Sequence, residues 1–134
     1  KQIIKDAGIF PKLKIFEKLP GGGTKATGPH RVKMISDKAV KVKDQKTGEI
    51  VQGIRYTVEE NGEMKNYTTK LLSEVGGVSY LVEKLAYIEE GEFVILEGTK
   101  GYNKNNYIEV RKDDGTIIEN KIADHEDDLD EEDE

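Results

Sequence analysis

The sequence predicts an all-β domain with one helix, and three observations support this fold class. Apolar and polar residues alternate over several stretches, which is typical of half-buried strands. Asn61-Gly62 separates two such stretches, and this dipeptide strongly favours a two-residue β-hairpin turn. One later segment instead has apolar residues at helical spacing, so a single helix is expected to interrupt the strands.

Length and composition fit one small globular domain. The chain has 134 residues, of which 35% are hydrophobic and 36% charged, and this is enough for one modest core. It contains no cysteine, which excludes disulfides and cysteine-ligated zinc and is compatible with a reducing cytoplasm. No apolar run approaches the length of a membrane span, so no membrane partner is expected.

The first 29 residues are expected to form a lead-in followed by a loop. KLKIFEKL (12–19) favours a short strand or an ordered lead-in. PGGGTKATGP (20–29) holds four glycines and two prolines, so a long loop is predicted there.

The stretch 30–43 is predicted to be a strand because apolar and basic residues alternate along it. The apolar face consists of Val32, Met34, Val40 and Val42. The outer, basic face consists of Arg31, Lys33, Lys41 and Lys43. A bend or bulge is expected midway, near Asp37 and Lys38.

The next two strands, 49–60 and 63–72, are expected to form a hairpin about Asn61-Gly62, since both positions of a type I′ turn need positive φ. A turn at 44–49 precedes them. Gly53 indicates a bend or a close backbone approach within the first of these strands. The residues of that strand predicted to point inward are Ile50, Ile54, Tyr56 and Val58.

A helix is predicted after the third strand, because apolar residues recur there at helical spacing. These residues are Val78, Leu81, Val82 and Leu85. Gly91 can close the helix in the left-handed conformation. A fourth strand is expected at 92–98 and a fifth at 107–112, with a loop at 101–106 between them. The segment 116–118 extends the fifth strand or adds an edge.

Three strands, a helix and two further strands follow one another in this scheme. That order fits the five-stranded Greek-key barrel of the oligonucleotide-binding (OB) fold, with the helix between strands three and four. The alternative is an open α+β sheet with one covering helix. The expected organisation is a lead-in and loop at 1–29, an OB-fold domain at 30–119 and a disordered acidic tail at 120–134.

Charge is distributed unevenly along the chain. Residues 1–46 hold 12 basic and 4 acidic residues, whereas residues 47–123 hold 9 basic and 14 acidic ones. DHEDDLDEEDE (124–134) holds nine acidic residues and no Lys or Arg. Such asymmetry favours nucleic-acid contact combined with a repelling or partner-seeking tail. A solvated surface with a solubilising tail is the alternative.

About half of the chain, from Glu59 onward, resembles the single-stranded-DNA-binding OB proteins of bacteria and their phages. The resemblance rests on a helix ending in Gly91, then Glu92-x-Val94-x-x-Glu97-Gly98, a loop, and Tyr107-Ile108-Glu109-Val110. The acidic tail is a second family trait. The resemblance implies sequence-independent binding of single-stranded DNA in replication or recombination, in the cytoplasm of a bacterium or of a phage-infected host.

The chain departs from that family in two respects. It has no Trp, a residue on which the family commonly stacks bases. Its tail ends in Glu134, where family tails finish with a short hydrophobic tip. Recruitment of replication or recombination proteins through the tail, and tuning of affinity by the tail alone, are therefore both open. A homo-oligomer is compatible with the sequence.

Binding of single strands requires cations for the phosphates and flat side chains on which bases stack. The candidate nucleic-acid-binding residues are Arg31, Lys33, Lys41, Lys43, Arg55, Lys65, Tyr67, Lys100, Tyr102, Lys104 and Tyr107. Tyr102 is the best stacking candidate, because the Gly, Asn and Lys residues around it offer little core to enter. Tyr67 has an inward core position as an equally weighted alternative.

No convincing catalytic set is present, so an enzyme is not expected, and neither is a cofactor or a metal site. His30 follows a Gly-Pro pair and is expected to be an ordinary surface residue. The acidic tail is expected to compete with DNA for the cationic groove. The alternative function is an OB-fold protein-interaction module whose acidic tail mimics nucleic acid.

Overall fold

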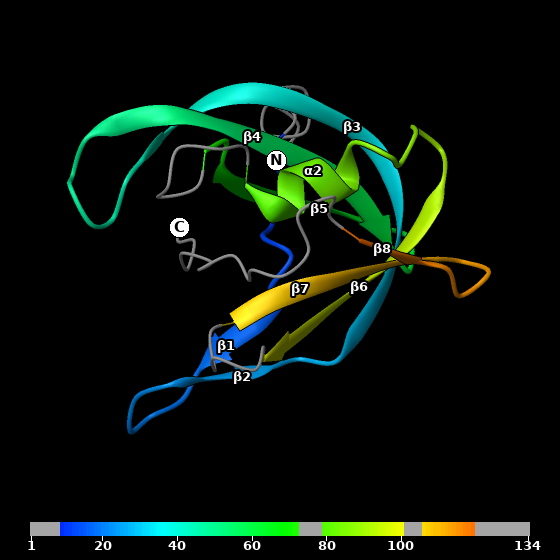
Figure 1. Cartoon of the computed structure of the whole chain (residues 1–134), viewed down its shortest axis with the longest axis horizontal. Helices are drawn as coiled ribbons and strands as arrows, with labels where there is room; N and C mark the ends of the chain where they lie inside the picture. The colour runs from blue at the N-terminus through cyan, green and yellow to red at the C-terminus, as the bar shows by residue number, and fades with distance from the viewer. Residues whose placement is uncertain (1–8, 73–78, 101–105, 120–134) are drawn as a thin grey trace.

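The structure is a computed structural model that describes residues 9–72, 79–100 and 106–119 (Figure 1). These residues form a mostly antiparallel β structure with one short helix, which confirms that part of the predicted fold class. The elements are β1 (Phe16–Lys18), β2 (Thr24–Ala26), β3 (Pro29–Lys43), β4 (Ile50–Glu60), β5 (Glu63–Lys70), α2 (Tyr80–Leu85), β6 (Phe93–Lys100), β7 (Asn106–Lys112) and β8 (Ile117–Ile118).

Six strands form one antiparallel sheet in the spatial order β5-β4-β3-β6-β7-β8. Hairpins join β3, β4 and β5, and the chain then returns through α2 to place β6 beside β3. This is the spatial order of a Greek key. In the part of the chain that the structure describes, no strand pairing joins the two outer strands, β5 and β8, so the sheet is open.

The lead-in forms a small hairpin of its own and attaches to the edge of the large sheet. β1 pairs with β2 around a turn in which Gly22 and Gly23 have positive φ, so the long loop predicted at 20–29 is correct for the turn and wrong for 24–26, which form a strand. Before β1, the Leu13 amide donates to the Asn66 carbonyl of β5 over 2.7 Å. The Asn66 amide donates in turn to the Pro11 carbonyl over 2.8 Å. The lead-in thereby provides hydrogen-bond partners for part of the otherwise unpaired backbone at the edge of β5.

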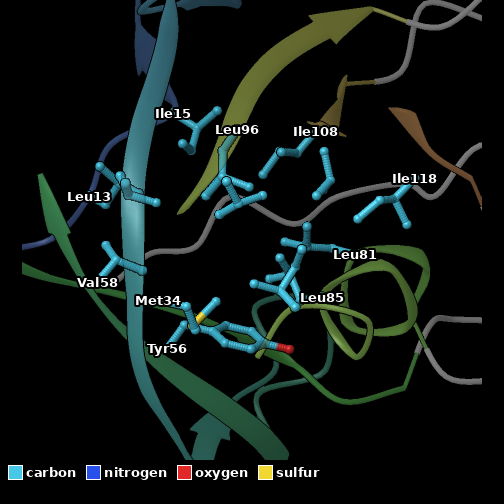
Figure 2. Close-up of a cluster of buried hydrophobic side chains, with 14 residues drawn as sticks. Leu13, Ile15, Met34, Tyr56, Val58, Leu81, Leu85, Leu96, Ile108 and Ile118 are labelled. Atoms are coloured by element: carbon cyan, nitrogen blue, oxygen red, sulfur yellow. The ribbon is translucent and has the colours of Figure 1, made fainter. Parts of the chain in front are cut away.

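One hydrophobic core fills the inner face of the sheet and is covered by α2 (Figure 2). Its buried members are Leu13, Ile15, Val32, Met34, Tyr56, Val58, Leu81, Leu85, Ile88, Val94, Leu96, Ile108, Val110 and Ile118. The inward positions predicted for Tyr56 and Val58 are therefore confirmed. Ile50 shares the inner face by register, as predicted, but it is 65% exposed because its end of β4 extends beyond the core.

A β-bulge at Ile35 reverses the faces of β3. Met34 lies opposite Val58, but Ser36 lies opposite Thr57, so β3 contains one extra residue between these pairs. Because side chains alternate strictly along a strand, the extra residue exchanges the two faces for everything that follows. Beyond the bulge, Lys41 and Lys43 share the face of Tyr56, whereas Val40 and Val42 lie on the outer face. The prediction of one continuous basic face from Arg31 to Lys43 is therefore wrong.

The β4–β5 hairpin turns as the sequence predicts, whereas the helix ends earlier than expected. Asn61 and Gly62 have φ of 53° and 84°, which confirms the predicted turn geometry. The hydroxyl of Ser79 accepts from the Val82 amide and caps the start of α2. The helix stops at Leu85, and Gly91 lies in a later turn where its amide donates to the Met34 carbonyl. Val78 lies outside the described residues.

Gly53 is the site of a close backbone approach, as predicted. A Cβ atom at this position would lie 2.7 Å from the Thr69 carbonyl oxygen and 2.8 Å from a Val42 methyl carbon. We expect Gly53→Ala to lower the free energy of unfolding by about 1–3 kcal/mol, since a backbone atom cannot move aside as a side chain can. Chemical denaturation measures this. Gly21→Ala is the matched control, since a Cβ there meets nothing within 4 Å; an equal loss in both variants would contradict the steric explanation.

Candidate nucleic-acid interface

The β3–β4 ribbon, which we define as residues 36–43 and 50–57, carries cations without acidic partners. These cations are Lys38, Lys41, Lys43 and Arg55. Within the described residues, none of the four has a carboxylate within ion-pair distance. Figure 1 shows the two strands arching away from the smaller hairpin toward their connecting turn. The ribbon is thus a basic arm whose charges are available to an anion.

Strand register fixes how these four cations are distributed over the two faces of the ribbon. Lys38 lies directly opposite Arg55, and Arg55 lies directly opposite Thr68 of β5. This row is on the outer face of the sheet. Lys41 and Lys43 lie opposite Gln52 and Ile50 on the inner face, beyond the end of the core. Two of the predicted binding residues, Lys41 and Lys43, are therefore separated from Arg55 by the thickness of the ribbon.

Arg31 differs from the ribbon cations because it already has an acidic partner. Its guanidinium donates two hydrogen bonds of 2.8 Å to the carboxylate of Asp113 and stacks 4.0 Å from the Phe93 ring centroid. These hydrogen bonds lower the pKa of Asp113 and raise that of Arg31. A phosphate that bound Arg31 would have to displace this carboxylate.

Lys33 and Arg111 are each ion-paired with carboxylates as well. Lys33 lies 3.6 Å from a Glu59 oxygen, and Arg111 donates to Glu97 over 2.9 Å and to Glu109 over 2.6 Å. The outer face of β3, β6 and β7 therefore consists of matched charges. Such a face attracts a polyanion weakly compared with the ribbon. The sequence identified Arg31 and Lys33 as cations but did not indicate their partners.

The two candidates on β5 face the core side of the sheet. Tyr67 packs against the hydrophobic core, so its inward position, one of the two alternatives, is the one observed. Lys65 donates to Glu60 over 2.8 Å. Neither side chain forms a surface together with Arg55, whose partner on β5 is Thr68.

The candidates around the loop between β6 and β7 are only partly described. The Lys100 ammonium donates to the Asn106 side-chain oxygen over 2.7 Å. Tyr107 is partly buried and its ring lies 5.3 Å from the ammonium of Lys84, a buried residue of α2. Tyr102 and Lys104 lie outside the described residues, so their expected contacts with bases and phosphates stay predictions.

The lead-in supplies a second set of cations that have no acidic partner in the described part of the chain. They are Lys14, Lys18 and Lys25, and all three are exposed. They do not lie on the predicted basic strand face, although the surplus of basic residues in the first 46 positions includes them.

His30 joins three elements, which its expected surface role did not anticipate. Its Nδ1 lies 2.7 Å from Glu60 at the end of β4, and its Nε2 lies 2.6 Å from the Thr27 hydroxyl before β3. That hydroxyl also donates to the Lys14 carbonyl of the lead-in over 2.8 Å. Because the Thr27 hydroxyl bonds both to this backbone carbonyl and to His30, and His30 bonds to Glu60, the cluster connects the lead-in to the β4–β5 hairpin.

Glu60 is expected to stabilise the fold in its ionised form. Burial opposes its ionisation, but hydrogen bonds from Lys65 and His30 outweigh burial and lower the pKa of this carboxyl. A lowered folded-state pKa stabilises the fold above the ordinary pKa, and this stabilisation is lost as the pH falls. We expect Glu60→Gln to lower the free energy of unfolding by about 1–3 kcal/mol at neutral pH.

The difference between Glu60→Gln and the unaltered chain is expected to shrink as the pH falls through the lowered pKa of Glu60, where this carboxyl becomes protonated. Denaturation at several pH values measures it. Glu63→Gln, an exposed position in the same hairpin, serves as the control and should change stability by less than about 0.5 kcal/mol. A pH-independent deficit in Glu60→Gln would contradict the ionic explanation.

Among the residues that the structure describes, no group of three or more His, Cys, Asp or Glu side chains could hold a metal ion. The same residues include no helix long and apolar enough to cross a membrane.

Comparisons with known proteins add no family assignment. No protein-family model matches the chain, and neither the curated proteins nor the solved structures give a match.

Proposed function

We propose that this chain is a sequence-independent single-stranded-DNA-binding protein that acts in replication or recombination without catalysis. The observation that carries the proposal is the segregation of its cations. Cations on the outer face of β3, β6 and β7 are neutralised by carboxylates, whereas the four on the β3–β4 ribbon are not. Unpaired cations on an extended arm attract a polyanion by releasing its condensed counterions.

The topology supports an OB-type fold as part of this proposal. β3, β4 and β5, then α2, then β6 and β7 follow one another as five strands with a helix between the third and the fourth. β6 returns beside β3 in Greek-key order. OB folds are partly open barrels that bind oligonucleotides on the face of their second and third strands and on nearby loops. In this chain those strands are β4 and β5, and β4 carries Arg55.

Fluorescence anisotropy with labelled oligo-dT tests the proposal. If the protein neutralises about 4–6 phosphates, the logarithm of the association constant should fall against the logarithm of salt concentration with a slope of roughly −3 to −4. An oligonucleotide of the same length but different base sequence should bind with similar affinity, because contacts to phosphates do not depend on which bases are present. An absence of binding at low salt, with and without the acidic tail, would refute the proposal and favour a protein-interaction module.

Deleting residues 124–134 is expected to tighten binding to oligo-dT and to leave the fold intact. These residues, which lie outside the described part of the chain, hold nine acids that can occupy a cationic surface and repel DNA. The gain should be largest at low salt, since the Debye length shrinks to about 8 Å near physiological ionic strength. The measurement compares dissociation constants of full-length and truncated protein at low and moderate salt. Equal constants at low salt would favour a purely solubilising tail.

A further inference from the structure

We propose that the row Lys38–Arg55–Thr68, which crosses β3, β4 and β5 on the outer face, is a phosphate-binding site. The proposal rests on the proposed function, in which the ligand is a phosphodiester of the bound strand. Strand register alone places the three side chains in one line, because residues directly opposite each other in antiparallel strands share a face. Sequence periodicity could not show this line, because Lys38 follows the bulge at Ile35 and its even position would otherwise place it on the apolar face of β3.

The two cations of this row repel each other in the free protein. Directly opposite residues have Cβ atoms only about 4.5–5.5 Å apart, and like charges in this relation are destabilising. Within the described residues, neither Lys38 nor Arg55 has a carboxylate within ion-pair distance. An anion bound between the ammonium and the guanidinium would replace this repulsion by two attractive contacts.

The neighbouring rows on the same face add hydroxyl groups, and the acid nearby, Asp44, is already ion-paired with Lys70. The preceding row contains Ser36 and Thr57, but the Thr57 hydroxyl is buried and accepts from the Asn66 side-chain amide over 2.9 Å, so Ser36 is the donor that this row can offer. The following row contains Val40, Gly53 and Lys70, and Lys70 faces Asp44 at 3.6 Å. Hydroxyl groups beside two adjacent cations are typical phosphate ligands.

Asp37 is next to Lys38 in sequence but lies on the opposite face. It is directly opposite Tyr56, whose pKa is raised by burial and, to a lesser degree, by the charge of Asp37. Alternation along β3 thus directs the carboxylate adjacent in sequence away from the row. The acid is positioned where it cannot neutralise Lys38, and the row keeps its positive charge.

The chemistry of the row suits a phosphate group in particular. The guanidinium of Arg55 can donate two parallel hydrogen bonds to two phosphate oxygens, and the Lys38 ammonium adds a mobile positive charge. The Thr68 hydroxyl can donate to a third oxygen. The guanidinium of Arg31 could donate the same two parallel hydrogen bonds, but it already donates them to Asp113. The row is therefore the favoured phosphate site among the described cations.

The test uses the full chain, the variant Lys38→Gln/Arg55→Gln, and the matched control Lys41→Gln/Lys43→Gln. The control removes the same charge from the same ribbon but from its other face. The first probe is inorganic phosphate, exchanged for chloride at constant ionic strength and read out as the melting temperature. Phosphate at roughly ten times its dissociation constant should raise the melting temperature of the full chain and of the control by several degrees.

Lys38→Gln/Arg55→Gln should show no such rise, and without phosphate at low salt it should melt no lower than the full chain, because the repulsion is gone. Arg55→Lys keeps the positive charge but cannot donate two parallel hydrogen bonds, so phosphate should raise its melting temperature by less than that of the full chain. Equal responses to phosphate in the full chain, the double variant and its control would overturn the site.

Oligo-dT as the second probe separates the two proposals. A selective phosphate response together with no oligo-dT binding would uphold the site and refute the proposed function. Oligo-dT binding that falls equally in Lys38→Gln/Arg55→Gln and in the control would uphold the function and overturn the site. The expected result is a selective phosphate response and an oligo-dT affinity that falls at least several-fold further in Lys38→Gln/Arg55→Gln than in the control.

Discussion

Neutralising the four ribbon cations is expected to weaken oligo-dT binding by about 100- to 1,000-fold near 0.1 M salt. The variant replaces Lys38, Lys41, Lys43 and Arg55 by glutamine. Each phosphate contact to a single strand contributes about 0.7 to the slope of log affinity against log salt, so four lost contacts lower that slope by up to about 2.8. The loss should therefore be greatest at low salt and nearly absent near 1 M. Anisotropy titrations at several salt concentrations measure both the constant and the slope.

A second variant with the same loss of charge controls for long-range attraction. It replaces the ion-paired cations Arg31, Lys33, Arg111 and Lys112 by glutamine. Because carboxylates already neutralise these cations, the expected loss of affinity is less than about tenfold. Melting curves of both variants establish that each is folded at the temperature of the titration. Equal losses of affinity would show that net charge and not the ribbon governs binding.

Ile15→Ala is expected to lower the free energy of unfolding by about 2–5 kcal/mol, the usual range for such a truncation in a core. Ile15 is only 2% exposed, although it belongs to the lead-in and precedes the large sheet in sequence. One of its methyl carbons lies 3.0 Å from where a Cβ on Gly98 of β6 would be. Figure 2 shows it beside Leu96. Removing its methyl groups leaves a cavity between the lead-in and the sheet.

Leu19→Ala provides the comparison, since Leu19 belongs to the same lead-in and is 41% exposed. Its truncation should lower stability by less than about 1 kcal/mol. Urea denaturation of both variants gives the two values. A loss at Ile15 as small as that at Leu19 would mean that the lead-in contributes little to the core.

The strands and the β4–β5 turn could be predicted from sequence because local chemistry determines them. Alternation of apolar and polar residues defines β4 and the first half of β3, where one face is buried. Asn61-Gly62 defines the turn because few residues tolerate two successive positive φ angles. The single helix follows from the spacing of Leu81 and Leu85 with their apolar neighbours.

The sequence predicts a bend or bulge near Asp37 and Lys38, and the bulge lies slightly earlier, at Ile35. Its exact position and its effect on the two faces could not be predicted, because the apolar pattern continues across it without a visible break. Val32, Val40 and Val42 all fall on even positions, which suggests one face. Beyond the bulge, however, the ribbon leaves the core, so burial no longer dictates which face is apolar. An error of one residue in register was enough to place Lys41 and Lys43 on the wrong face.

The pairing of the candidate binding residues also depends on contacts between distant parts of the chain. Asp113 is 82 positions away from Arg31, and Glu60 is 30 positions away from His30. No local pattern indicates either pair. Sequence therefore identified the cations of the chain, whereas register and packing determined which of them are free of acidic partners.

If single-stranded DNA binds to the β3–β4 ribbon, an NMR titration of the isotope-labelled full chain with oligo-dT should locate it there. We expect the largest amide shift changes in residues 36–43 and 50–57 and at Thr68, and we expect them to diminish as salt is raised. Small changes are expected at the ion-paired Arg31 and Arg111. Changes concentrated around those ion-paired residues, with an unaffected ribbon, would refute binding at the ribbon.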